Sequence, residues 1–173
     1  MRYDGLMQRC QAVLVVVVLL AAGCAARQAQ VAVQASLTSL ATGLVAADEA
    51  VAAAMPDAAA EARDQVLREP GCVSTDQGLA RYDVLMRPWA DAVEALRVTR
   101  AALYLAQGGV SVWIESGNLP ASWEPLCADV GASVEALVEL LQNLGIELPE
   151  VVPLLAEYAE QACTVAGPWI AGR

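Results

Sequence analysis

The chain has 173 residues, a formal net charge of −10 at pH 7, and no histidine, lysine or phenylalanine. This length fits one domain with a single hydrophobic core. The missing residue types exclude an imidazole base, a Schiff-base lysine and a phosphate-gripping P-loop lysine, and the negative charge argues against nucleic acid as a partner.

Residues 1–23 have the pattern of a secretory signal. Arg2 and Arg9 flank a polar start, and an apolar run follows from Ala12 to Ala22. This run is shorter than the roughly 20 apolar residues that a transmembrane helix needs. We therefore expect residues 1–23 to be a signal peptide and not a permanent membrane anchor.

The end of this segment, Leu20-Ala21-Ala22-Gly23-Cys24, resembles the lipobox of bacterial lipoproteins. In that family small residues precede a cysteine that is lipidated and becomes the mature N-terminus. Ala21 departs from the pattern because the family more often has leucine there. Ordinary signal-peptidase cleavage near Ala25 or Ala26 is therefore the alternative.

The resemblance implies that Cys24 carries a diacylglyceryl group and an amide-linked acyl chain such as palmitate. Several acyl chains together hold a protein at a membrane almost irreversibly. Some lipoproteins have aspartate directly after the cysteine, whereas this chain has Ala25. In a Gram-negative cell the lack of aspartate at this position implies the outer membrane, facing the periplasm. We expect residues 24–30 to form a short tether to one helical-bundle domain within residues 24–173.

The first part of the mature chain, residues 28–69, predicts either one kinked helix or two short helices. Its apolar positions alternate by four and three residues, as on one face of a helix. Pro56 is expected to end or kink this helix, and Pro70-Gly71 to stop it. The apolar positions are Val33, Leu37, Leu40, Leu44, Ala47 and Val51.

A second helix is expected after residues 74–76, with a bend at Pro88 and an end at Gly108-Gly109. Residues 110–118 then read as a turn-rich connection. The apolar face of this helix consists of Tyr82, Met86, Trp89, Val93, Leu96 and Leu103.

Two further helices are predicted in the last third of the chain, and Gly145 separates them. We expect the last helix to begin at Pro149. The third helix presents Cys127, Val130, Val134, Leu137, Leu141 and Leu144, and the last presents Val151, Leu155, Tyr158, Ala162, Val165 and Trp169. The fold class is therefore all-α, an up-and-down antiparallel bundle of four to five amphipathic helices.

Three cysteines follow Cys24, and an exported protein can form disulfides. Counting outward from the middle of the turn at 145–149 places Cys127 and Cys163 at nearly the same height of a helical hairpin. This favours a Cys127–Cys163 disulfide and leaves Cys72 free. Two reduced buried thiols, or Cys72 paired with either partner, are the alternatives.

The spacing of the helices places Trp113, Trp123 and Trp169 at one end of the bundle. Three indoles together are a candidate contact surface, or else they fill the end of a core built from small residues. Asp91 and Glu94 lie at helical spacing and have the chemistry of an acid–base pair, although such pairs on exposed faces usually serve solvation.

These observations favour a non-enzymatic lipoprotein of the cell envelope that acts as an interaction or structural module, with an envelope protein as its partner. A carrier of a small apolar ligand or lipid is the alternative, and a prophage or mobile-element origin is compatible with the small size. We expect no cofactor and no metal site, because no Cys-x-x-Cys pair and no histidine is present.

Overall fold

The computed structural model describes residues 4–69, 75–146, 150 and 152–170, and within it the side chains from Cys24 to Trp169. Cys72, Pro149 and Val151 lie outside the described residues. In the described part every regular element is an α-helix. The helices are α1 (Asp4–Arg68), α2 (Thr75–Ser116), α3 (Trp123–Asn143) and α4 (Leu155–Ile170).

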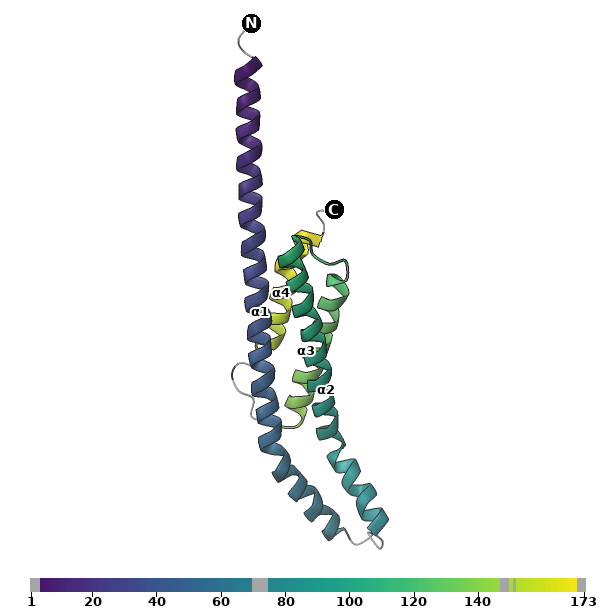
Figure 1. The fold of residues 1–173 in the computed structure, drawn as a ribbon. Helices are drawn as coiled ribbons and strands as arrows, with labels where there is room; N and C mark the ends of the chain where they lie inside the picture. Colours follow the sequence, from purple (N-terminus) through teal and green to yellow (C-terminus); the bar gives the residue numbers. More distant parts are fainter. Residues whose placement is uncertain (1–3, 70–74, 147–149, 151, 171–173) are drawn as a thin grey trace.

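The four helices run alternately down and up, as Figure 1 shows. Helix α1 packs against α2 and α4, and α3 packs against the same two helices from the other side. The prediction of an all-α, up-and-down bundle is therefore confirmed, with four helices among the described residues.

Helix α1 is one continuous helix that contains Pro56, so the alternative of two short helices is wrong. It persists because its apolar face is buried between two neighbouring helices, and this tertiary packing stabilises a helix more than local propensity does. All six predicted apolar positions are at most 3% exposed. They are Val33, Leu37, Leu40, Leu44, Ala47 and Val51.

The lower parts of α1 and α2 extend past α3 and α4 and bend together to one side (Figure 1). Each of these helices contains one proline, Pro56 in α1 and Pro88 in α2. A proline inside a helix removes one backbone donor and crowds the preceding turn, which bends the axis. We call residues 56–68 and 75–88, which form this projecting part, the distal hairpin.

The predicted end of the second helix at Gly108-Gly109 is wrong, because α2 continues to Ser116. Residues 110–116 are thus helical and not part of a turn-rich connection. Burial of Trp113 in this extra length offsets the low helix propensity of two glycines, about 1 kcal/mol each relative to alanine. The helix stops at Gly117, whose φ of 71° is strained for other residues and whose N–H donates to the carbonyl of Trp113 at 2.9 Å.

The end of α3 follows the prediction at Gly145, which has a φ of 67°. The N–H of Gly145 donates to Gln142 O at 3.0 Å, and that of Ile146 donates to Leu141 O at 3.4 Å. These two bonds form a Schellman motif, which ends a helix at a glycine. Helix α4 begins only at Leu155, later than Pro149, the predicted first residue.

Each pair of neighbouring helices has a specific polar or covalent link besides its apolar contacts. Arg100 of α2 pairs with Asp48 of α1 at 2.9 Å. The buried Thr99 hydroxyl lies 3.1 Å from the Ser133 carbonyl of α3. Ser36 of α1 donates to Gln161 of α4 at 3.2 Å. Ser36 and Thr99 are buried, and because buried polar groups need partners, their bonds help to fix the helix register. The half-exposed Arg100–Asp48 pair contributes less.

The fourth link is the disulfide between Cys127 of α3 and Cys163 of α4, as the heights of the two helices predicted. Their Cα atoms are 5.6 Å apart, and 36 positions separate them in the sequence. Closing a loop of this length stabilises the folded state by about 3–4 kcal/mol in the chain-entropy picture. The disulfide thus links α3 to α4, the remaining pair of neighbouring helices.

Candidate functional site

The three predicted tryptophans meet at one end of the bundle, which we call the tryptophan end. Trp113 lies near the end of α2, Trp123 is the first residue of α3, and Trp169 lies near the end of α4. The ring centroids of Trp113 and Trp169 are 6.2 Å apart, with an interplanar angle of 47°. Such tilted aromatic pairs stabilise a fold beyond their apolar burial.

The tryptophans are mainly part of the core. Trp113 and Trp123 are each 1% exposed, and only Trp169 is partly accessible. A contact surface made of three indoles is therefore wrong for Trp113 and Trp123, which fill the end of a core rich in alanine and valine. The Nε1 atom of Trp123 is buried and has no hydrogen-bond partner among the described residues.

Gly109 makes this packing possible. A Cβ atom added at Gly109 would lie 3.3 Å from Cε3 of Trp123, tighter than ordinary van der Waals contact. The absence of a side chain on this α2 residue thus lets the indole of α3 lie directly against the helix backbone. The neighbouring Gly108 faces solvent, and a Cβ atom added there would meet nothing within 4 Å.

Helix α1 joins the bundle at the tryptophan end. Its Gln30 side chain donates to the carbonyl of Trp113 at 3.2 Å, in the last turn of α2, and Ala29 packs against the core. Cys24 is exposed and lies six residues earlier, or about 9 Å along a helix. Residues 24–30, expected to be a tether, are thus helical, and the last two of them already contact the bundle.

By length and composition, the part of α1 from Cys24 to Arg68 could cross a membrane, and it alone passes that test among the described residues. The core helix of a soluble protein passes the same test, because its buried face is apolar. Val33 and Leu40 lie on such a face, and a third of the apolar window is buried in the bundle.

The distal hairpin lies at the opposite end of the molecule and has few buried residues. Arg81 pairs with Glu69 at 3.1 Å, and Val66 packs near Gly78, whose added Cβ would lie 3.5 Å from Val66 Cγ1. Large apolar side chains are exposed here, including Leu67 at 76% and Leu79 at 58%. The hairpin is thus a slender arm with accessible apolar residues.

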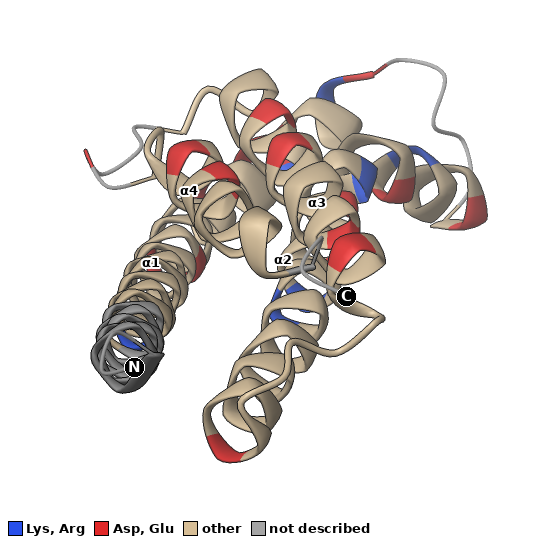
Figure 2. Cartoon of the chain, turned by 90° about the horizontal axis from the view of Figure 1, so that it is seen from above, with Lys and Arg blue, Asp and Glu red and all other residues tan. Residues whose placement is uncertain are grey.

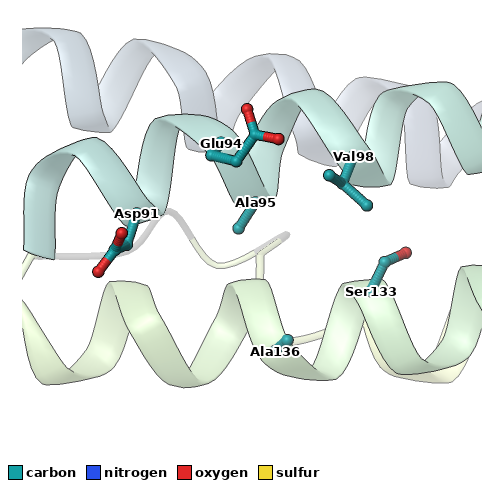
Figure 3. A pocket seen from close by; sticks show the side chains of 6 residues that line it. All are labelled: Asp91, Glu94, Ala95, Val98, Ser133 and Ala136. Atoms are coloured by element: carbon teal, nitrogen blue, oxygen red, sulfur yellow. The ribbon is translucent and has the colours of Figure 1, made fainter.

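A shallow groove of about 260 Å³ lies between α2 and α3 (Figure 3). It is smaller than the roughly 300–1,000 Å³ of typical ligand pockets. Its walls are mostly alanine and valine, with two carboxylates at the rim. The lining residues are Asp91, Glu94, Ala95, Val98, Ser133 and Ala136.

The two rim carboxylates, Asp91 and Glu94, point in different directions and do not converge on one point (Figure 3). Glu94 instead accepts two hydrogen bonds from Arg97, at 2.5 and 2.7 Å. This bonding lowers the pKa of Glu94 and raises the pKa of Arg97. Glu94 is therefore ionised at neutral pH, which is the wrong state for a general acid.

Among the described residues no group of three cysteine or carboxylate side chains lies close enough together to hold a metal ion. Comparison with protein-family models, with curated proteins and with solved structures finds no match to this chain. What distinguishes the molecule is its two ends, with exposed Cys24 close to the tryptophan end and the distal hairpin far from it.

Sequence reasoning missed the distal hairpin and the Gly109–Trp123 contact. The hairpin was missed because the helical periodicity of residues 56–68 and 75–88 does not show that α3 and α4 are too short to cover them. A signal for the Gly109–Trp123 contact was present, since Gly109 is one of two adjacent glycines within an otherwise helical pattern.

We predict opposite effects for two alanine substitutions at these adjacent glycines. Gly108→Ala should raise the free energy of unfolding by about 0.5–1 kcal/mol, because alanine is the better helix former and nothing hinders its Cβ. Gly109→Ala should leave stability at or below that of the wild type, because the buried Trp123 has little room to move. Urea unfolding followed by circular dichroism compares the variants, and equal stabilisation by both would contradict the packing at the tryptophan end.

Proposed function

We propose that this protein is a lipid-anchored lipoprotein of the bacterial envelope, which acts as a non-enzymatic interaction module. The anchor is an acyl-modified Cys24, and the part that reaches a partner is the distal hairpin. The observation that carries the proposal is that one helix, α1, holds the exposed Cys24 close to the tryptophan end and continues into the distal hairpin.

Two features support the anchor. The residues before Cys24 resemble a lipobox, and Cys24 is exposed about 9 Å along the helix from the contact between Gln30 and Trp113. An anchor at this place leaves almost no free chain between membrane and bundle. The tryptophan end would then face the membrane, and Ala25 favours the outer membrane of a Gram-negative cell.

Two features support an interaction role. The 45 helical residues from Cys24 to Arg68 span about 66 Å along the helix, which holds the hairpin well away from the anchor. The hairpin presents Leu67 and Leu79 with little burial, and a partner that covers them would remove this apolar surface from water. The partner would be another envelope protein, located at a distance from the membrane surface that holds the anchor.

We predict that Cys24→Ala abolishes membrane attachment. Full-length wild type expressed in a bacterial host should fractionate with membranes, and its intact mass should exceed that of the cleaved polypeptide by a diacylglyceryl group plus an acyl chain. Cys24→Ala should lose both properties, whereas the control Cys72→Ala should keep them. A wild type that is cleaved near Ala25 or Ala26 and recovered as a soluble protein would overturn the anchor.

A photo-crosslinking amino acid at Leu67 tests the interaction role in the same cells. We expect an adduct of defined mass with one envelope protein when the probe is on the distal hairpin. The matched control places the probe at Ala132, an exposed position on α3. Identical adducts from both positions, or none from either, would contradict an interaction surface on the hairpin.

A further inference from the structure

One face of the bundle lacks charged residues. Residues 28–47 of α1 and 101–114 of α2 contain no aspartate, glutamate or arginine. We call the exposed side of these two neighbouring stretches the charge-free face. Helices α3 and α4, by contrast, have six acidic residues and no basic ones, and Figure 2 shows this contrast between red residues on α3 and α4 and long tan stretches on α1 and α2.

The charge-free face carries large apolar side chains that no described part of the chain covers. Tyr104 is 77% exposed, Leu105 58% and Val112 51%, all on α2. On α1, Val31 is 61% exposed and Val45 is 52%. Scattered exposed apolar residues are normal in soluble proteins, but a cluster without any charge is typical of an interface.

The exposed residues of α2 have the spacing of a helix–helix seam. Ala101, Leu105, Gly108 and Val112 are spaced by four, three and four residues and are all exposed. A second seam on the same helix, centred on Leu96, Leu103 and Val110, is already buried inside the bundle. Helix α2 thus has two apolar seams, and the outer one is of the kind that packs against another helix.

The size of the face suits a second copy of this chain. At 1.5 Å per residue and 8–10 Å between helix axes, two stretches of this length cover roughly 500 Å² on each copy. A pair of such faces buries about 1,000 Å² in total, the lower bound for a specific protein interface.

The distribution of charge also selects this face. Two copies with a net charge of −10 each repel one another, most strongly if the acidic α3–α4 sides meet. The charge-free face itself contributes no charged side chain to such a contact. The arginines at its lower border are already neutralised within the chain, Arg97 by Glu94 and Arg100 by Asp48.

We propose that the charge-free face binds the same face of a second copy of this chain, so that Leu105 and Val112 pack against their counterparts across a two-fold axis. The face runs along the helices and not across the tryptophan end, so an upright molecule turns it toward a neighbour and not toward the bilayer. The parallel orientation of the two copies rests on the proposed anchor at Cys24, whereas the pairing of the faces does not.

Disulfide trapping in intact cells tests the proposal with the full-length chain. In a Cys72→Ser background, Leu105→Cys should give a disulfide-linked dimer on a non-reducing gel, several-fold above the background protein. The control Ala132→Cys, on the acidic side, should give none above background. Adding Val112→Glu to Leu105→Cys should abolish the dimer, whereas adding Ala128→Glu on α3 should not, and circular dichroism checks that each variant is folded.

Three results would overturn the proposal. These are no dimer from Leu105→Cys, equal dimer from Leu105→Cys and Ala132→Cys, and a mixed disulfide of Leu105→Cys with a different envelope protein in place of the dimer. Repeating the trapping with Cys24→Ala separates this inference from the proposed function. A dimer that forms without membrane attachment shows that the pairing of the faces does not depend on the anchor. Failure of the proposed anchor would then leave this inference standing.

Discussion

The structure depends on the burial of one side of α1 between α2 and α4. Six apolar residues from Val33 to Val51 lie on that side and are almost inaccessible to water. Burying a side chain of valine or leucine contributes about 1.5–3 kcal/mol relative to leaving it exposed. This contact joins the part of α1 that follows Cys24 to the core, and it makes the same helix the support of the distal hairpin.

The remaining helices complete the bundle around this contact. Ion pairing of Arg100 with Asp48, the Thr99 and Ser36 hydrogen bonds and the Cys127–Cys163 disulfide link the four neighbouring helix pairs one by one. Apolar packing alone allows helices to slide along one another, whereas a directional bond between two fixed positions opposes such sliding. The bundle is therefore a firm base, and the helices that extend past it have only each other for support.

Much of this architecture was predictable from periodicity, because each helix buries a regular stripe of its own sequence. The apolar face of α1 and the end of α3 at Gly145 follow from spacing, and counting from the turn favoured the Cys127–Cys163 disulfide over its alternatives. The length of α2 could not be predicted in this way, because the contact of Gly109 with Trp123 joins residues of different helices and overrides the low helix propensity of glycine. The charge-free face and the distal hairpin likewise appear only when the neighbours of each helix are known.

The central claim is that the molecule stands upright, with the tryptophan end at the membrane and the distal hairpin far from it. Energy transfer from a fluorescent amino acid to an acceptor lipid in the same membrane tests this directly. We predict strong transfer from position 121, in the connection between α2 and α3 at the tryptophan end, and weak transfer from position 67 in the hairpin. Equal transfer from both positions would mean that the molecule lies flat on the membrane and would contradict this account.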